Sequence, residues 1–371
     1  MNPGWQELCI HHHDENKDSL ILELIRPLVR WLEPQVEVVF FVRHWLRGPH
    51  LSLRYRSDTT GLDALRPHLE AQVSAYLALH PSRTTLDETT LLPIHQRLAH
   101  DEMETRDLTP FHPNNTWHFT AYDRRLHVMS DGIARLIETF HAQTNDLVFD
   151  MLEHLRSGRN RVDLALDLMI ATLQAVTPDI VSRFVSYHSH AEVFIVNTRD
   201  DNVTRAHFER QYAQNAASLA ARLHRILEGI ATDQDSVPFL QRWTALMTDY
   251  TGRIEAGVTR GDIAFEPYRA DAPRTAAYLE GEARLRKSRF HAMQLDDRAN
   301  IEARSQDAGF NTFRMLVNLQ YLLLNRIGLR PFERSLLAYL ISNAVEAHFQ
   351  VSAFELARTH TYTRAAVGDA A

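Results

Sequence analysis

The sequence lacks several features that would place the protein in a specialised class. It has one cysteine, Cys9, so no disulfide can form within the chain, and this fits a reducing compartment. No apolar run is long enough to span a bilayer and the N-terminus has no signal-peptide pattern, so we expect a cytoplasmic protein. The formal charge of -7 lacks the basic excess of most nucleic-acid-binding and membrane-surface proteins. We therefore expect neither nucleic acid nor a membrane as a partner.

The composition is that of an ordinary globular protein. Hydrophobic residues make up 44% of the chain and charged residues 23%, with only 13 glycines and 14 prolines in 371 residues. These values favour a helix-rich fold. The length suggests about two domains, or one large domain with inserted elements. We predict an α+β unit with an antiparallel sheet in residues 1–125 and a mainly helical part in residues 126–371, with one compact domain as the alternative.

Hydrophobic periodicity predicts a β-α-β-β-α order at the start of the chain. It comprises a strand over residues 5–10, a helix to Leu32 that Pro27 kinks or restarts, a hairpin over 36–56 and a helix over about 60–80. Residues 81–113 have weak periodicity and are predicted to be a long excursion with short extended pieces. Other predicted elements are strands over 115–122 and 191–196, helices over 130–186, 204–228, 310–327 and 332–349, a linker over 252–273 and a frayed tail after Thr363.

The hairpin is the most informative segment of the sequence. β-branched and aromatic residues alternate on both sides of Gly48-Pro49, which supplies turn chemistry. If residues 46–49 form the loop, His44 lies on the apolar face. The opposite face then carries Arg43, Trp45, His50, Ser52 and Arg54. Two arginines and a histidine on one face predict either a partly covered pocket for an anionic group or solvated charges, and the tryptophan favours the pocket.

A second signal lies on the predicted helix over residues 310–327. Four residues share one stripe of this otherwise apolar helix: Arg314, Asn318, Tyr321 and Asn325. In an exposed helix the stripe is simply the solvated side. In a buried helix it must be hydrogen-bonded or line a cavity, and a tyrosine among Arg and Asn donors is then a candidate proton donor.

Two histidine-rich segments and one basic run have weaker signals. Tyr187, His188 and His190 follow an apolar helix at a predicted element boundary, where either site residues or surface histidines occur. The consecutive histidines at 11–13 resemble a metal cluster, but neighbours on a strand point to opposite faces, so we expect a polar strand end and no metal. The basic residues over 284–289 form a patch of low specificity.

Several of these segments together resemble the lantibiotic dehydratase C-terminal family. The resemblance lies in residues 5–10 and 17–22, the Arg43-His44-Trp45 and 48–51 hairpin, the run 186–190 and the helix end at 325–329. It covers most of the chain, with distinctive motifs at the two ends and a poorly matched middle. Standalone members of this family act in thiopeptide biosynthesis.

The resemblance implies one of two activities. Members that eliminate glutamate from glutamylated Ser or Thr have a histidine one helical turn before the Asn-Arg pair, and this sequence has Tyr321 there. The tyrosine, with the hairpin motifs, is similar to the pyridine synthase branch. That branch implies a formal [4+2] cycloaddition of two dehydroalanines, loss of water and expulsion of the leader peptide. A non-catalytic scaffold that binds the leader is the third hypothesis.

The pyridine synthase hypothesis assigns roles to particular residues. Tyr321 would be the hydrogen-bond donor or general acid, positioned by Asn318 and Arg314, while His50 and Arg43 would assist proton transfer and carbonyl polarisation. Peptide contacts would come from Arg54, Trp45, Tyr187, His188, His190 and Asn325. The implied partner is a precursor peptide, with its leader in a groove of the α+β unit. No cofactor is implied, and a homodimer is left open.

Overall fold

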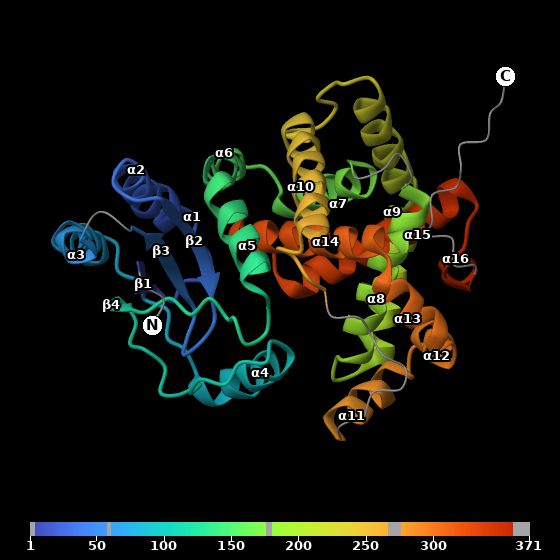
Figure 1. The fold of residues 1–371 in the computed structure, drawn as a ribbon, viewed down its shortest axis with the longest axis horizontal. Coiled ribbons are helices and arrows are strands. Elements are labelled where there is room, and N and C mark those ends of the chain that lie inside the picture. The colour runs from blue at the N-terminus through green and yellow to red at the C-terminus, as the bar shows by residue number, and fades with distance from the viewer. Residues whose placement is uncertain (1–3, 58–60, 176–179, 266–275, 359–371) are drawn as a thin grey trace. The chain divides into compact units, whose positions relative to one another are not determined.

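A computed structural model describes residues 4–57, 61–175, 180–265 and 276–358 (Figure 1). By its internal contacts the chain divides into two units. Unit 1 comprises Met1–Arg159 and Leu322–Gly328, and unit 2 comprises Asn160–Tyr321 and Leu329–Ala371. The boundary expected between residues 125 and 126 stays a prediction. The α+β opening with an antiparallel sheet and the mainly helical remainder are confirmed.

Unit 1 is built on a four-stranded antiparallel sheet in the order β2-β3-β1-β4. The strands are β1 (Trp5–His11), β2 (Val38–His44), β3 (His50–Arg56) and β4 (Thr116–Thr120). One face of the sheet is apolar, and Leu8, Ile10, Leu51 and Leu53 on that face are fully buried. Strand alternation therefore sends every second side chain of β1 and β3 to the other face, which carries the polar residues described below.

Helices cover both faces of this sheet. The helical run α1 (Asp18–Leu20), η1 (Ile21–Ile25) and α2 (Arg26–Leu32) is continuous, with a π-helical turn just before Pro27. Figure 1 shows α2 and α3 (Leu62–Leu79) on one side of the sheet and α5 (Asp131–Gln143) on the other. On the polar face His141 of α5 stacks on Phe40, and on the apolar face Phe149 of α6 (Asn145–Arg156) stacks on Phe41. The predicted β-α-β-β-α order and the effect of Pro27 are confirmed.

The excursion predicted over residues 81–113 contains a helix, so that part of the prediction was wrong. Helix α4 (Glu88–Asp101) begins after Asp87, whose side chain accepts a hydrogen bond from the Thr89 backbone N–H. Only His95 and Ala99 of its described side chains are buried. The helix contains Pro93 in its interior, and proline there is ordinarily a sign that a helix breaks, so the segment did not suggest a helix.

Unit 2 consists of helices. They are α7 (Arg161–Ala175), α8 (Ile180–Val196), α9 (Asp201–Ala231), α10 (Leu240–Arg260), α11 (Ala276–Leu285), α12 (Arg289–Asp296), α13 (Arg298–Gln306), α14 (Ala308–Arg326, to Tyr321 in this unit), α15 (Pro331–Phe349) and α16 (Ala353–Arg358). The core forms where α15 packs along α8 and α9 and α7 packs on α10 (Figure 1). The predicted helices over 204–228, 310–327 and 332–349 are confirmed.

Two sequence-based expectations in unit 2 were wrong. The segment 191–196 is the end of α8 and not a strand, because Tyr187, Ala191 and Ile195 repeat every four residues and are all buried on one helix face. The expected linker from residue 252 overlaps α10, where Ile254 and Gly257 are buried. Helix α10 ends at Gly261, which has a positive φ. Residues 266–273 of that linker and the tail after Thr363 lie outside the described residues.

In the described part of the chain no helix combines the length and apolar character that crossing a bilayer requires.

Candidate active site

The hairpin that carries the predicted site is present, but its register was predicted one residue out. The loop comprises residues 45–49, His44 pairs with His50, and Arg43 pairs with Leu51. A shift of one residue exchanges the two faces of a strand. His44 therefore shares the polar face with His50 and Arg54, whereas Arg43 lies on the apolar face with Leu51.

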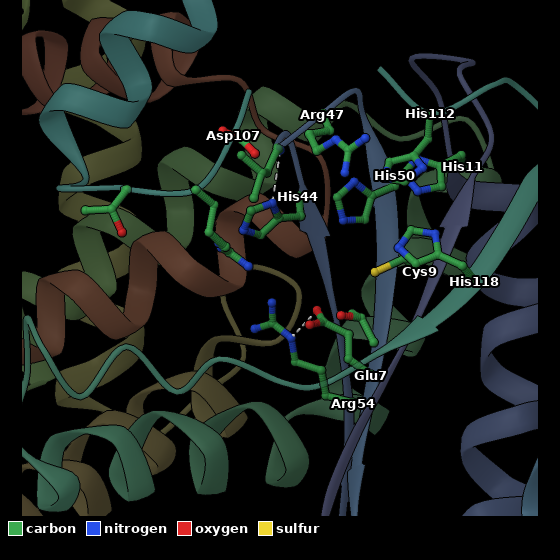
Figure 2. A pocket seen from close by; sticks show the side chains of 14 residues that line it. Glu7, Cys9, His11, His44, Arg47, His50, Arg54, Asp107, His112 and His118 are labelled. Carbon is green, nitrogen blue, oxygen red and sulfur yellow. Dashed lines mark hydrogen bonds and ion pairs between the residues drawn. The ribbon is translucent and has the colours of Figure 1, made fainter. Parts of the chain in front are cut away.

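The polar face of the unit 1 sheet opens into a pocket of about 390 Å³. Its walls are side chains of all four strands together with residues 46–47 of the hairpin loop and residues 105–107 and 112. Figure 2 shows Glu7 and Arg54 at one end of the pocket and a group of histidines at the other. We call the group formed by His11, His112 and His118 the histidine cluster. The predicted pair His50 and Arg54 does line this pocket.

A buried ion pair fixes the position of Arg54. Its Nε donates to Glu7 Oε1 at 2.8 Å, and its guanidinium lies 4.4 Å from the centre of the Tyr122 ring. Burial acts to raise the pKa of Glu7, but the charge and hydrogen bond of Arg54 outweigh it and hold that pKa below its usual value. Both groups are therefore charged near neutral pH. Sequence reasoning missed Glu7, although Glu7 and Cys9 alternate on the first predicted strand and so must share a face.

The histidines of the hairpin are neutral. Burial lowers the pKa of His50 to about 4, and its Nδ1 is 2.9 Å from the Gly48 carbonyl oxygen. Burial lowers the pKa of His44 as well, and its Nδ1 accepts a hydrogen bond from the Leu46 backbone N–H. Neutral imidazoles at these sites can accept or donate a hydrogen bond but do not supply positive charge.

The structure places Arg43 and Trp45 outside the residues that line the pocket. Arg43 donates to the carbonyl oxygen of Arg326 at 3.0 Å and to Asp18 Oδ1 at 3.1 Å. Its guanidinium lies 3.0 Å from where a Cβ on Gly328 would be, so this approach needs glycine. Trp45 donates from Nε1 to Glu102 Oε1 at 3.2 Å. Arg43 thus contacts the end of the late helix motif within unit 1.

Arg326 is fully buried and comes directly after Asn325. It belongs to the Asn-Arg pair of the family resemblance, although the sequence alone suggested no role for it. Its guanidinium donates to the His141 carbonyl oxygen, Thr144 Oγ1 and Asn145 Oδ1 at 2.6 to 2.9 Å. Asn325 itself is exposed. Within the Asn-Arg pair, the arginine therefore stabilises the fold of unit 1, whereas the asparagine side chain is exposed to solvent.

Unit 2 contains a second cavity, of about 530 Å³, with mixed polar and apolar walls. Helices α8, α12, α13 and α14 contribute Ser189, His190, His291, Arg304, Phe313 and Arg314 among other residues. The predicted His190 and Arg314 thus line one cavity. A space of this size with few convergent polar groups is typical of sites for small molecules and peptide segments.

A phenol is hydrogen-bonded to the cavity histidine. The Tyr321 hydroxyl lies 2.9 Å from His190 Nδ1, and the Arg334 guanidinium lies 4.2 Å from the centre of the Tyr321 ring. Burial raises the pKa of Tyr321 well above its usual value, and burial lowers the pKa of His190 to about 4. The pair is therefore a neutral phenol and a neutral imidazole across the physiological range. Arg334 was not singled out from the sequence, because it lies on a different helix.

A second hydroxyl–imidazole pair lines the same cavity. Ser189 Oγ lies 2.9 Å from His291 Nε2, and burial lowers the pKa of His291 to about 4. His291 lies in the first turn of α12, where its backbone N–H donates to the Ser288 hydroxyl oxygen, and that hydroxyl donates to Glu192 at 2.7 Å. Sequence reasoning missed His291, since no local pattern connects it with a serine one hundred residues earlier.

The remaining predicted residues of unit 2 lie elsewhere. Tyr187 is fully buried, and its hydroxyl donates to the Met169 carbonyl oxygen and to Gln320 Oε1 at 3.0 and 2.7 Å. His188 lies between Phe290 and Phe354 in a separate pocket of unit 2. Asn318 is exposed. His190 and Arg314 are thus the predicted residues that line this cavity, Tyr321 reaches it only through its hydrogen bond with His190, and the roles of all three stay predictions.

Comparison with known proteins identifies the family. The model of the lantibiotic biosynthesis dehydratase C-terminal family matches residues 5–345. The chain belongs to this family. A search of curated proteins found no match.

Three solved structures are similar to this chain. The pyridine synthase TbtD, from thiomuracin biosynthesis, is 26% identical, with a TM-score of 0.72 over 94% of this chain and 100% of that one. TsrL is 20% identical with a TM-score of 0.67, over 95% of this chain and 97% of that one, and shows the fold alone. The tRNA-dependent lantibiotic dehydratase MibB from Microbispora sp. 107891 is 16% identical with a TM-score of 0.49, over 94% of this chain and 29% of that one.

Proposed function

We propose that the protein is a thiopeptide-maturation enzyme that forms a pyridine ring by a formal [4+2] cycloaddition of two dehydroalanines in a linear precursor peptide. Family membership and the 26% identity to TbtD, which is described as a pyridine synthase, support this class of reaction. The observation that carries the proposal is the neutral Tyr321–His190 pair beside the unit 2 cavity.

The first chemical demand of this reaction is to draw one backbone amide into its iminol form. That step needs a donor to the carbonyl oxygen and an acceptor for the N–H proton. If His190 carries its proton on Nδ1, it donates to the Tyr321 oxygen, and the phenol proton is free for the substrate carbonyl. His190 Nε2 is then unprotonated and can accept the amide proton. The proposal therefore assigns Tyr321 as donor and His190 as its partner and acceptor.

The second demand is to hold the two alkenes together. Bringing reactants into contact can account for several kcal/mol of a barrier, about 7 or more in well-oriented cases. The apolar walls of the cavity, including Phe310 and Phe313, suit the alkenes, and Arg314 at the same cavity suits a peptide carbonyl. Positioning is thus assigned to the cavity walls and not to a charged catalyst.

Aromatisation completes the reaction and needs further proton transfers. The iminol oxygen leaves as water, and the amide nitrogen that linked the ring to the leader leaves with it as a carboxamide. Each departing group takes up a proton. The Ser189–His291 pair at the same cavity provides a second neutral donor and acceptor for these transfers.

The pocket of unit 1 is assigned to the precursor peptide. Arg54 and His50 present a cation and a neutral donor–acceptor on one sheet face, which fits carbonyl or carboxylate groups of an extended peptide. Arg43 and Trp45 would not contact the peptide in this assignment. They would act indirectly, by holding the segments that contain Arg326 and Glu102. His50 is assigned here to contact with the peptide, and a role of the hairpin in proton transfer stays a sequence-based prediction.

Incubation of the purified full chain with a precursor containing two dehydroalanines, followed by mass spectrometry, tests the proposal. We expect a cyclised core together with a released leader carboxamide. Loss of glutamate from a glutamylated peptide without a new ring would indicate the eliminase activity instead. Tight binding of the precursor with no change of mass would indicate a leader-binding scaffold. Either of the last two results overturns the proposed function.

A further inference from the structure

We propose that the histidine cluster of unit 1 binds one transition-metal ion of the zinc class. The cluster takes one residue from the end of β1, one from β4 and one from the loop between α4 and β4: His11, His118 and His112. This site is separate from the chemistry proposed for the unit 2 cavity and does not rest on it.

The geometry of the cluster suits a shared ion. Each of the three histidines offers one ring nitrogen as a ligand, and these three nitrogens all lie within 4.8 Å of one another. Among the described residues this is the group of side chains that could share a metal ion. Ring centres are 4.4 Å apart for His11 and His112, 4.4 Å for His112 and His118, and 5.2 Å for His11 and His118. Zinc–nitrogen bonds of about 2.0–2.1 Å place tetrahedral ligands about 3.3 Å apart. The three rings are stacked, with planes 10° to 29° apart, so an ion binds only when the side chains rotate to bring one nitrogen of each ring to this spacing.

His11, the most buried residue of the cluster, lacks hydrogen-bond partners. His11 is 0% exposed, and neither its Nδ1 nor its Nε2 has a hydrogen-bond partner among the described residues. A buried polar group without a partner costs about 1–3 kcal/mol, and such groups in native proteins usually have an explanation. A metal ion bound by one of the two nitrogens is such an explanation. Figure 2 shows His11 facing His112 and His118 at the wall of the pocket.

The cluster is in the protonation state that metal binding requires. Burial lowers the pKa of His11, His112 and His118, so all three imidazoles are neutral and have free lone pairs near neutral pH. The charged groups that face them are Arg47, which opposes a cation, and Glu7, which favours one. The nearby thiol of Cys9 has its pKa raised to about 12, first by burial, so it remains a neutral thiol.

The backbone around the cluster is held in place without the ion. The His112 backbone N–H donates to the Arg47 carbonyl oxygen at 3.0 Å, and the Asn115 N–H donates to the His11 carbonyl oxygen at 2.7 Å. These two bonds fix the loop that carries His112 against the sheet. Three imidazoles at the wall of a pocket leave a fourth position for water or a substrate oxygen, which is the arrangement of open zinc sites.

A titration of the full-length protein tests this proposal. The chain is freed of metal with a chelator, titrated with zinc chloride alone by calorimetry, and desalted for metal analysis. We expect one zinc per chain. His112→Ala and His118→Ala should each raise the Kd at least tenfold, because loss of even an outer-shell partner costs about 10–100-fold. The exposed His127, outside the pocket, provides the matched control, and His127→Ala should bind zinc as the unmodified protein does.

A second measurement needs no variant and so does not depend on whether the variants fold. Diethylpyrocarbonate modifies accessible histidines, and peptide mass mapping with and without zinc shows which are protected. Zinc should protect His112 and His118 and leave His127 reactive. Absence of zinc binding by the unmodified protein, unchanged binding in both cluster variants, or protection that misses the cluster would each overturn the proposal.

Discussion

The histidine cluster of unit 1 and the two histidines of the unit 2 cavity are all buried or half-buried, and burial lowers the pKa of each, but their partners differ. In unit 2, His190 is hydrogen-bonded to Tyr321 and His291 to Ser189. In unit 1, His11 lies among other imidazole rings and neither of its ring nitrogens has a partner in the described residues. Each of the two unit 2 imidazoles has a hydroxyl with which to share a proton, whereas the N–H and the lone pair of the neutral His11 ring both lack a partner in the described residues.

This difference shows that burial alone does not define the role of a histidine. Desolvation is the largest cause of the lowered pKa in both units. The neighbouring atom then decides between proton transfer and ligation, since a hydroxyl can donate a proton and a second imidazole can share a metal. The five predictions below test the two regions compared here, beginning with the largest effect.

The change Tyr321→Phe removes the hydroxyl of the Tyr321–His190 pair and leaves the ring. Loss of a positioned proton donor costs about 10²–10⁴-fold in rate, so we expect single-turnover cyclisation to fall by that amount. Affinity for the precursor should stay within about threefold, because the substrate-lining walls are retained. The matched control is Tyr76→Phe in α3, outside both cavities, which should cyclise at the normal rate. A Tyr321→Phe protein within threefold of the normal rate would contradict the assignment.

The change Glu7→Gln tests the buried charge pair of the unit 1 pocket. Glu7 and Arg54 have side chains that are 5% and 15% exposed, and removing one partner of a buried pair costs about 3–5 kcal/mol. We expect urea unfolding at neutral pH to show a loss of about 3 kcal/mol. The control Glu37→Gln breaks a pair with Arg56 whose side chains are 37% and 31% exposed, and should cost about 0–1 kcal/mol.

The same pair predicts a pH dependence of stability. The pKa of Glu7 is lowered in the folded protein, so its stabilising effect is present above the unfolded pKa of about 4.5 and is lost as the pH falls through the folded value. Glu7→Gln should remove that part of the acid-induced loss. Equal acid sensitivity in the two proteins would show that Glu7 is not a paired carboxylate.

The change Ser189→Ala removes the hydroxyl partner of His291. A single hydrogen bond contributes about 0.5–1.5 kcal/mol, so we expect cyclisation to fall by about threefold to tenfold, with the loss in kcat. The exposed Ser218 of α9 provides the control, and Ser218→Ala should have no effect. An unaffected Ser189→Ala enzyme would remove the second pair from the proposed mechanism.

The smallest expected effect is the response of cyclisation to pH. Both cavity histidines have a pKa lowered to about 4, and the pKa of Tyr321 lies above its ordinary value. Both pairs therefore keep their protons between about pH 5.5 and about pH 9, and the single-turnover rate should change less than about twofold there. A steep rise or fall near pH 6.5 would show that one imidazole titrates normally and that the site is wetter than the structure implies.

Much of the fold was accessible from local sequence patterns. Residues 5–10, 60–80 and 332–349 have clear periods of two or 3.6, and their strands and helices formed as predicted. Helix α4 was missed because Pro93 lies in its interior, where proline ordinarily indicates a break in a helix. The segment 191–196 was misassigned because β-branched residues suggested a strand while the burial of Ala191 and Ile195 follows a helix.

The candidate site was accessible only in part. His50 and Arg54 were predicted to share a face and do so, because alternation within one strand is exact and local. Arg43 was placed on the wrong face, since the pairing of two strands depends on the loop length, and this loop has five residues. The partners in the pairs His190–Tyr321 and His291–Ser189 come from helices far apart in the chain. No local sequence pattern connects them, so each pair became visible only when the helices packed together.

The sequence by itself determined the family, the β-α-β-β-α opening and the alternation of side chains within each strand, because these depend on residues close together in the chain. Tertiary structure alone decided that three histidines at positions 11, 112 and 118 form one cluster and that a tyrosine and a histidine 131 positions apart share a hydrogen bond. The physical reason is that the strength of these contacts depends on distances of a few ångströms between side chains, and only packing of the whole unit sets such distances.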